Sequence, residues 1–350
     1  MAIKNKGTVN SKTKINKTIR HTQTHRMMQP NTWHDGELIK KYGMLKKINY
    51  SLIAVVIILA ALYLQPYVLN YGKPHFGNSI ANIDMQLSPS NLAIINNASN
   101  NNFEIAGEML INQTLKDPVL PFPANKTNQY PEFIVNGKPS VIYIGAISCV
   151  YCAENRWAMA LALSRFGSFN KLFYGYSAFG DGDVPTLYWN DYNYTTNKGI
   201  GYSNYYSSNY INFISADSES NITQGFTMQP LSDFIASAPN ETYLKAFEFM
   251  NSTNKFQGTP FTFWGTTLET GADGIVFGNS TPTSNKLDIT YMTHQQVLDQ
   301  LKNFNDQFAY GEYAAADVYI AYTCPSINNS APVCTLPAIK KLEILMNVAK

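Results

Sequence analysis

Four cysteines are the residues of this 350-residue chain whose types and spacing suit chemistry. Cys149 and Cys152 form a Cys-x-x-Cys pair, whereas Cys324 and Cys334 lie far downstream with nine residues between them. Four cysteines permit three pairings. Two thiols three positions apart close a small ring that can open and close by thiol–disulfide exchange. The spacing favours a redox pair at Cys149–Cys152 and a structural disulfide at Cys324–Cys334, which would stabilise the fold by about 2–3 kcal/mol in the loop-entropy model.

A zinc site with four thiolate ligands is the alternative use of these cysteines. Nine residues separate Cys324 from Cys334, however, whereas the members of a zinc-binding pair are separated by about two to four. His75 and His294 are distant in sequence from the cysteines and from each other. We therefore predict no metal site and no cofactor, and a Cys–His nucleophile has little support.

The residues around Cys149 and Cys152 predict the two elements that must position them. Residues 141–146 form a short apolar run rich in β-branched and aromatic side chains, which is typical of a strand buried on both faces. Residues 153–166 contain no Gly or Pro and favour a helix of about four turns. Cys149 then lies near the first turn of this helix, where unpaired N–H groups and the helix dipole favour a thiolate. Cys149 is the predicted nucleophile and Cys152 the resolving thiol.

A second feature lies far downstream, in residues 257–264, which read QGTPFTFW. Thr259 and Pro260 form an X-Pro bond, the kind for which cis is cheap, and the alternating residues after it suit a strand. Together with the order strand, Cys-x-x-Cys, helix, this stretch resembles the thioredoxin superfamily. In that family the Thr-Pro step is cis and leads into the next core strand, facing the two sulfurs. The sequence around the pair looks most like an uncharacterised archaeal family of membrane-anchored thioredoxin-like proteins, because it contains Cys-Ala-Glu, Arg-Trp-Ala and Leu-Ser-Arg-Phe-Gly. This resemblance covers roughly residues 129–350.

The resemblance implies an α/β, thioredoxin-like fold and protein thiols or disulfides as substrates. Cys149 would carry the more exposed sulfur, and a membrane or soluble redox partner would reoxidise or reduce the pair. Thr259 would offer its backbone to an extended substrate segment, and Pro260 would keep metals away from the sulfurs. The residues implied to contact the substrate are Thr259, Pro260, Val150 and Tyr151, the last two of which tune the reduction potential in the family.

Three further residues on the predicted helix follow the cysteines closely in sequence. Glu154 has the chemistry to relay protons to Cys152, but an exposed face of the helix is the simpler expectation for it. Arg156 is expected to be a snorkelling or paired arginine, and Trp157 to anchor the core.

The resemblance also requires a long insertion, because about eighty residues separate the expected second core strand at 171–178 from the Thr-Pro step. We place this insertion at about residues 179–257 and expect it to cap the active face. Its tyrosine-rich first half, 181–210, would either bind sugars by ring stacking or form ordinary surface loops. Other elements predicted by the pattern are strands at 210–216 and 274–277 and helices at 231–236, 241–249, 293–304, 314–322 and 338–348.

Charge and hydropathy predict a membrane anchor near the amino terminus. Residues 1–48 hold eleven Lys or Arg against two acids, a net charge near +9 in a chain of only +2. Residues 48–69 are apolar, with Tyr50, Tyr63, Tyr67 and the nearby Tyr71 as candidate interfacial anchors, and as a helix they would span roughly 33 Å, close to a bilayer core. We predict a basic cytoplasmic arm at 1–47 and a single-pass transmembrane anchor at 48–69. A basic arm beside a membrane segment is more simply a topology signal than a nucleic-acid site, so no nucleic-acid partner is expected.

A cleaved secretory signal is the alternative to this anchor, but about 47 residues precede the apolar stretch, far more than such a signal carries. The lysines directly before the segment favour an amino terminus in the cytoplasm and a carboxy-terminal domain outside the cell membrane. All four cysteines then lie on the oxidising side. The lysines are Lys40, Lys41, Lys46 and Lys47.

Residues 70–128 are dominated by Asn, Ser, Pro and Gln and predict a stalk, apart from a helix near 103–115; residues 129–350 then form the external domain. Nine Asn-x-Ser/Thr triplets follow the anchor, a density that suits a glycosylated outer surface. Asn16 also fits the triplet but is expected to stay unmodified in a cytoplasmic arm. The nine triplets begin at Asn97, Asn112, Asn125, Asn193, Asn221, Asn240, Asn251, Asn279 and Asn328.

Two functions fit the sequence. The first is a membrane-anchored, extracytoplasmic thiol–disulfide oxidoreductase that uses Cys149 and Cys152. The second is a non-catalytic surface or envelope protein on the same scaffold, in which the pair is a fixed structural bond. A reduction potential below about −300 mV would mark the second.

Overall fold

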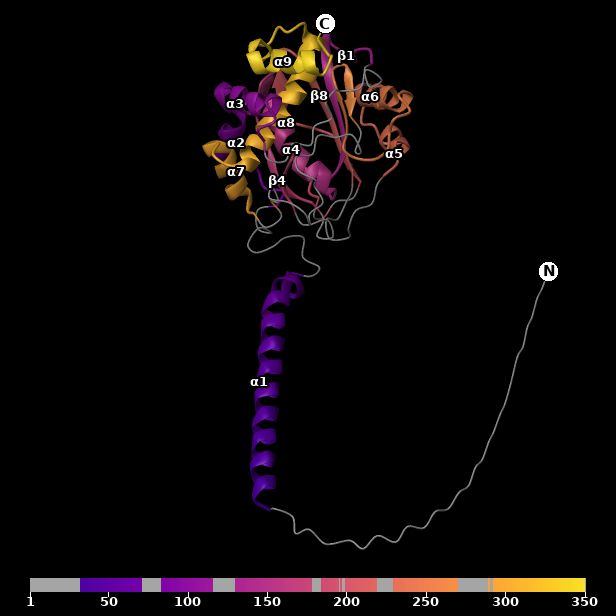
Figure 1. The fold of residues 1–350 in the computed structure, drawn as a ribbon. Helices are drawn as coiled ribbons and strands as arrows, with labels where there is room; N and C mark the ends of the chain where they lie inside the picture. Colours follow the sequence, from indigo (N-terminus) through magenta and orange to yellow (C-terminus); the bar gives the residue numbers. More distant parts are fainter. Residues whose placement is uncertain are drawn as a thin grey trace, which may run out of the picture. The chain divides into compact units, whose positions relative to one another are not determined.

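The computed structural model describes residues 32–70, 83–115, 130–177, 184–194, 196, 199–218, 229–269, 289 and 292–349. It divides into two units, residues 1–64 and 65–350. The larger unit is a mixed α/β structure with helices on both faces of a mixed sheet (Figure 1).

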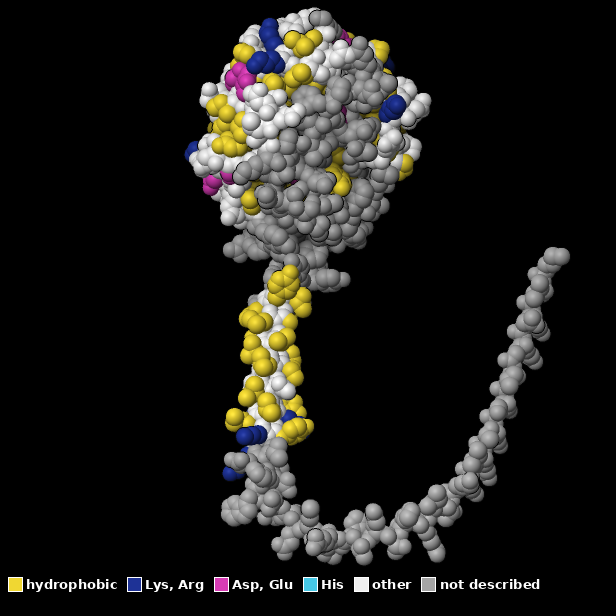
Figure 2. Space-filling model, in the orientation of Figure 1, with side chains coloured by type: hydrophobic (Ala, Val, Ile, Leu, Met, Phe, Trp, Pro, Cys, Tyr) yellow, Lys and Arg dark blue, Asp and Glu magenta, His cyan; other side chains and the backbone are white. Residues whose placement is uncertain are grey.

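Helix α1 (Thr32–Asn70) contains the predicted anchor at 48–69. Its segment Lys40–Leu64 has a mean hydropathy of 2.0 and none of it is buried. Among the described residues it is the one helix long and apolar enough to cross a membrane. Apolar side chains cover this segment and lysines lie at one end of it, as Figure 2 shows. Of the expected tyrosine anchors, Tyr50 and Tyr63 are exposed on the helix, whereas the side chain of Tyr67 and all of Tyr71 lie outside the described residues.

The main sheet is built around β2 (Lys138–Ala146), the strand predicted at 141–146. β8 (Asn212–Ser218) pairs with it in parallel, with Val141 opposite Phe213. β9 (Phe261–Trp264) pairs antiparallel on its other side, with Ile142 opposite Phe263. The order is β10-β9-β2-β8-β6, in which β10 (Thr267–Glu269) and β6 (Ile200–Gly201) are antiparallel to their neighbours and β1 (Ile134–Val135) also pairs with β2.

The prediction that residues 171–178 form the second core strand is wrong. Residues 173–176 do form a strand, β4 (Phe173–Tyr176), but it pairs with β5 (Pro185–Tyr188) in a separate hairpin. The parallel neighbour of β2 is β8, which matches the strand predicted at 210–216 and lies inside the expected insertion of 179–257. A short apolar run predicts a strand but does not say which strand it will pair with. The strand expected at 274–277 lies outside the described residues.

Alternate residues of β2 face two hydrophobic cores. Val141 and Tyr143 face the core formed with α4 (Val150–Leu163) and α8 (Gln307–Thr323), as is expected for a strand covered on both sides. Ile142 and Ile144 face a second core. That core is closed by α5 (Leu231–Ala236) and α6 (Glu241–Ser252), which lie on the opposite side of the sheet (Figure 1).

Most predicted helices are confirmed, with ends that differ by a few residues. The helix expected at 153–166 is α4, and those expected at 231–236 and 241–249 are α5 and α6. A capping box of Thr293 and Gln296 starts the helix expected at 293–304. The remaining elements are α7 (His294–Asn303), α9 (Pro337–Leu345), the short strands β3 (Gly167–Phe169) and β7 (Tyr206–Ser208), which pair with each other, and the 3₁₀ turns η4 (Cys324–Ile327) and η5 (Pro332–Thr335).

The stalk interpretation is wrong for residues 83–115. The helix expected near 103–115 is α3 (Asn100–Ile111), and it packs against α8 and α9; Phe103 and Leu110 on it are buried. α2 (Pro89–Asn96) precedes it, and Arg165 donates to the carbonyl oxygens of Asn96 and Ala98 at 2.7 and 2.5 Å. Few apolar residues suffice here because they share one helix face that meets a core built by distant residues. The rest of the expected stalk, 71–82 and 116–128, lies outside the described residues.

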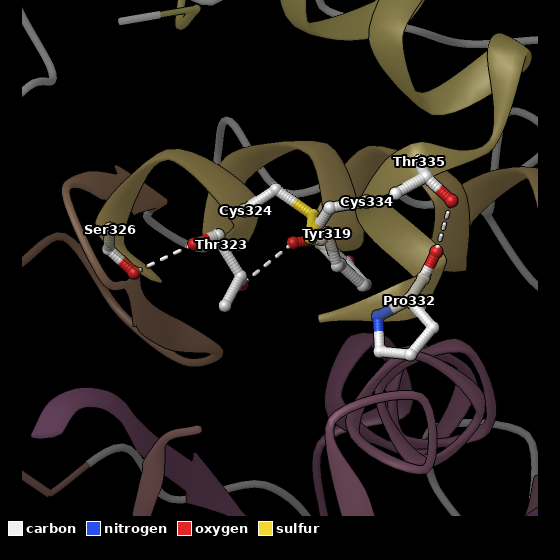
Figure 3. The surroundings of a disulfide bond; sticks show 7 residues. All are labelled: Tyr319, Thr323, Cys324, Ser326, Pro332, Cys334 and Thr335. Carbon is white, nitrogen blue, oxygen red and sulfur yellow. Dashed lines mark hydrogen bonds between the residues drawn. A yellow bond between two sulfur atoms is a disulfide. The ribbon is translucent and has the colours of Figure 1, made fainter. Parts of the chain in front are cut away.

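The predicted disulfide Cys324–Cys334 is confirmed. Both cysteines are fully buried, and the loop they close connects η4 to η5. In Figure 3 the bond lies between two hydrogen-bonded turns, since Thr323 donates to the Tyr319 carbonyl at 2.9 Å and Thr335 to the Pro332 carbonyl at 2.7 Å. The bond takes two of the four thiolates that a Cys₄ zinc site would need.

Replacing both members of this disulfide, Cys324→Ala with Cys334→Ala, is expected to lower the free energy of unfolding by about 2–3 kcal/mol, because the unfolded chain gains the entropy of an open loop. Denaturant unfolding of the full chain in detergent, followed by tryptophan fluorescence, measures the change. The matched control is Cys149→Ala with Cys152→Ala. This variant also removes two cysteines, but their thiols are free in this structure and a bond between them would close a much smaller ring. A loss below about 0.5 kcal/mol for the first variant would contradict the entropic account.

His294 fastens the start of α7 to the β4–β5 hairpin. Its Nε2 donates to the carbonyl oxygens of Gly175 and Thr186, at 2.7 and 3.1 Å, and its ring packs on Tyr174 and Tyr176. Burial lowers the pKa of His294 to about 4, against which the two carbonyls act only in part. The folded chain therefore holds a neutral imidazole at pH values where the unfolded chain binds a proton.

The free energy of unfolding should consequently fall as the pH drops from about 6.5 to about 4, by roughly 3 kcal/mol from His294 alone. A His294→Gln variant keeps an N–H donor but does not titrate, so its stability should lack this part of the pH dependence. Urea unfolding across the pH range, compared between the two proteins, measures the difference. Parallel pH profiles would show that His294 does not cause the loss.

Candidate functional site

The Cys-x-x-Cys pair lies where β2 ends and α4 begins. Cys149 is the N-cap residue of α4, with φ −75° and ψ 124°, and Val150 starts the helix. Cys152 then falls one turn inside, and its sulfur accepts a hydrogen bond from the N–H of Ala146 at 3.5 Å. The helix start predicted for Cys149 is therefore the one found.

The Thr-Pro step meets the pair across 110 residues of sequence. The Cys149 thiol donates to the carbonyl oxygen of Thr259 at 3.6 Å. The peptide bond between Thr259 and Pro260 is cis, as the resemblance described above implies. This meeting follows from the sheet, because β9 starts directly after Pro260 and pairs with β2, with Phe261 opposite Ile144.

Both sulfurs are buried. Cys149 is 3% exposed and Cys152 fully buried, so the expected difference between them is small. Of the other residues expected to contact a substrate, Tyr151 is 38% exposed, while Val150 and Thr259 are each 6% exposed. Tyr151 thus presents the main surface of this group to solvent.

A buried ion pair lies beneath the cysteines. Arg156 on α4 donates through Nη2 to Asp217 Oδ1 on β8 at 2.6 Å, and both side chains are shielded from solvent. The same Nη2 donates to the carbonyl oxygen of Ala146 at 3.1 Å. Burial lowers the pKa of Arg156, but Asp217 outweighs burial and raises it. Arg156 is therefore a paired arginine rather than a snorkelling one, and Trp157 beside it is a core anchor whose Nε1 donates to the Pro185 carbonyl.

This arrangement separates the pKa values of the two thiols. Burial raises the pKa of Cys152, but the hydrogen bond from Cys149, the charge of Arg156 and the Ala146 N–H together lower it. The hydrogen bond to Cys152, burial and the charge of Cys152 raise the pKa of Cys149 well above its ordinary value. In the reduced pair the thiolate is thus favoured on Cys152 and the proton on Cys149. This differs from the expectation that the helix start favours a Cys149 thiolate.

Tyr143 on β2 completes the polar group under the sulfurs. Its buried hydroxyl lies close enough to Cys152 for the charge of that sulfur to raise the tyrosine pKa, and the Arg156 guanidinium lies 5.8 Å from its ring centre. Burial raises the pKa of Tyr143 well above its usual value, so it stays a neutral phenol. A Cβ on Gly145 would overlap the Tyr143 hydroxyl and lie 2.5 Å from Asp217 Oδ1, so glycine at this position leaves room for the group.

Glu154 does not lie on an exposed face. It is half-buried, and burial together with the charge of Glu154 raises the pKa of Glu312 on α8 well above its ordinary value. Glu312 therefore keeps its proton to a higher pH than an ordinary carboxylic acid does. The groups that shift the pKa of Cys152 are Cys149, Arg156, Ala146 and Asp217, so the alternative proton-relay role of Glu154 gains no support.

Asp217 and Tyr143 are the two neighbours of the pair that sequence reasoning missed. Asp217 was a detectable signal, because it is the one acid in the buried strand Asn212–Ser218, and a buried charge needs a partner. Arg156, on the buried face of α4, was the matching signal. No sequence signal links Tyr143 to Cys152, because the run 141–146 is apolar throughout, as in any strand buried on both faces.

The tyrosine-rich segment is not a row of exposed rings. Tyr188 and Tyr194 are fully buried and pack edge to face at 4.8 Å, and Tyr192 packs on Tyr194. These rings fill a small core with Ile147 and Phe173. Sugar stacking on Tyr188 and Tyr194 is therefore excluded in this structure.

Within the described parts of the chain, no group of three or more His, Cys, Asp or Glu is placed to hold a metal ion. Fold and site together define a mixed α/β protein with a buried Cys-x-x-Cys pair at a strand–helix junction. The chain belongs to a family described as a domain of unknown function, DUF929, whose model matches residues 126–325. The matched region holds both Cys149–Cys152 and the Thr-Pro step. No curated protein and no solved structure matches the chain.

Removing the buried charge with Arg156→Met is expected to raise the pKa of Cys152, because the thiolate loses its nearest positive group. The same change should lower the free energy of unfolding by about 3–5 kcal/mol, since Asp217 is left buried and unpaired. Arg156→Met with Asp217→Asn should recover part of the stability but keep the raised thiol pKa. Thiolate ultraviolet absorbance against pH, beside denaturant unfolding, measures both; an unchanged thiol titration in the double variant would contradict the role of Arg156.

Proposed function

We propose that this protein is a membrane-anchored thiol–disulfide oxidoreductase with a thioredoxin-like fold, acting on protein cysteines outside the cytoplasm. The observation that carries the proposal is the position of Cys149. It caps the helix that follows a central strand, and its thiol lies 3.6 Å from the carbonyl oxygen of Thr259, next to Pro260. A sulfur in this position would lie beside a backbone edge to which an extended substrate segment could bind, which supports the proposal.

The order of the main sheet supports the thioredoxin-like fold. β2, which leads to the cysteines, has a parallel neighbour in β8 and an antiparallel neighbour in β9, which follows the Thr-Pro step. A further antiparallel strand, β10, lies beyond β9, and helices cover both faces. In this assignment the insertion lies between α4 and β8, where the β4–β5 hairpin and the β3–β7 strand pair form.

The two sulfurs are assigned different steps. The proton on Cys149 passes to the Cys152 thiolate, and the Cys149 thiolate attacks one sulfur of a partner disulfide. The partner S–S bond breaks, a mixed disulfide forms, and the other partner sulfur leaves as a thiolate. Cys152 then gives its proton to the partner thiolate released in the first step and attacks the Cys149 sulfur, which releases the second partner thiolate. The partner gains two electrons, and Cys149–Cys152 becomes the disulfide; the reverse sequence oxidises a partner dithiol.

Burial supports this division of roles. Cys152 is fully buried in the first turn of α4, and its sulfur accepts a hydrogen bond from the Ala146 N–H, as suits a resolving thiol. Cys149 has the remaining exposure, and Tyr151 beside it has the largest exposed surface near the site. A partner segment that binds along Thr259 would displace the atoms that cover Cys149.

The proposed location follows from α1. Its apolar segment, Lys40–Leu64, would cross the cell membrane once. Lysines at its amino-terminal end favour the cytoplasm for residues 1–47 and the exterior for the unit that carries the cysteines.

A non-catalytic role is the second candidate, and the burial of both sulfurs favours it. In that case Cys149–Cys152 would be a fixed bond and the unit a surface or envelope binding module. The reduction potential separates the two candidates, because a structural bond has a potential below about −300 mV.

A Cys152→Ser variant of the full chain is expected to accumulate mixed disulfides through Cys149, because the resolving step is removed. Non-reducing gels and mass spectrometry of membranes treated with acid to stop exchange would show the trapped partners, which a reductant should release. The matched control, Cys149→Ser with Cys152→Ser, should trap none. If nothing is trapped while Cys149 in the single variant still reacts with an alkylating agent, the oxidoreductase proposal fails.

A further inference from the structure

The Asn-x-Ser/Thr triplets are the sequence motif that the redox proposal leaves unused. Six of the nine begin in the part of the chain that the structure describes, and in all six the asparagine is exposed. Among the eighteen other asparagines with described side chains, ten are exposed and eight are half-buried or buried. All six triplet asparagines are therefore accessible from the surface. The six are Asn97, Asn112, Asn193, Asn240, Asn251 and Asn328.

Five of the six exposed triplets also begin at the ends of helices, where an enzyme can reach the chain. Asn97 and Asn112 are the C-caps of α2 and α3, and Asn328 is the C-cap of η4. Asn240 is the N-cap of α6, and Asn251 lies in the last turn of the same helix. An asparagine in the middle of a packed strand or helix would not be reachable in the folded protein.

The side-chain amide of Asn240 has one atom engaged and one atom available for modification. Its Oδ1 accepts hydrogen bonds from the N–H groups of Thr242 and Tyr243, at 3.0 and 3.2 Å. Those bonds turn the oxygen toward the helix, and no described hydrogen bond uses Nδ2, which is left for modification. Asn240, Thr242 and Tyr243 also line an open groove of about 630 Å³, which gives room around the acceptor.

We propose that this protein carries N-linked oligosaccharides on these exposed triplets, with Asn240 as the best-presented acceptor. The donor is an oligosaccharide joined through its anomeric carbon to the phosphate of a membrane lipid carrier. The anomeric C–O bond breaks, a bond from that carbon to Nδ2 forms, Nδ2 gives up one proton, and the lipid phosphate leaves with the electron pair. This proposal rests on the external location proposed above but not on the redox activity of Cys149.

The test is mass spectrometry of peptides from the full chain, purified from the membranes of the cells that make it. We expect the Asn240 peptide to carry the added mass of sugar units. Asn240→Asp should remove that mass completely while the fold is kept, because aspartate caps a helix as well as asparagine does. Thr242→Ser should keep the mass and Thr242→Val should lose it, since the hydroxyl completes the triplet.

Two asparagines serve as internal controls. Asn254 is exposed near Asn251 but does not begin a triplet, so its peptide should be unmodified. Asn16 begins a triplet in the basic arm and should also be unmodified if that arm is cytoplasmic. An unmodified Asn240 peptide, or sugar on Asn16 with none on Asn240, would overturn the proposal. Partner trapping by Cys152→Ser should be the same with and without Asn240→Asp, so failure of either proposal can be told from failure of the other.

Discussion

The ion pair between Arg156 and Asp217 is the interaction on which the rest of the site depends. It joins α4 to β8 and, through the Ala146 carbonyl, to the end of β2. Taking two charges out of water costs several kcal/mol per ion, and only good geometry with further hydrogen bonds repays that cost. The pair is therefore a poor source of stability but a strict constraint on geometry. Any shift of α4 relative to the sheet would separate buried opposite charges.

That constraint reaches the sulfurs because Cys152 lies one turn before Arg156 on the same helix. The charge of Arg156 and the Ala146 N–H act on the inner sulfur, whereas the outer sulfur contacts the neutral Thr259 carbonyl. The two thiols are adjacent in the sequence pattern, yet their environments are opposite. Their difference in proton affinity is thus a property of the core and not of the Cys-x-x-Cys motif.

The helical face opposite α5 and α6 is completed by residues that come before the family match. Phe103 of α3 packs edge to face on Tyr313 of α8, with ring centres 4.9 Å apart. Arg165, which follows α4, holds the segment before α3 by two hydrogen bonds to carbonyl oxygens. α8 in turn packs on α4, so the amino-terminal helices support the element that carries the cysteines. The matched region of the family, residues 126–325, therefore does not contain all of the core.

Local pattern was enough for the elements nearest the chemistry. Three local patterns predicted β2, α4 and the start of β9: the apolar run 141–146, the Gly- and Pro-free run 153–166 and the Thr-Pro step. They sufficed because the periods of strands and helices depend on residues that are close in sequence. The spacing of Cys324 and Cys334 was likewise enough to predict their bond. Only tertiary structure decided that β8, not β4, pairs with β2, that residues 83–115 join the core, and that Asp217 meets Arg156. Each of these depends on which distant surfaces meet, and a sequence period gives the face that a residue occupies but not the partner that covers it.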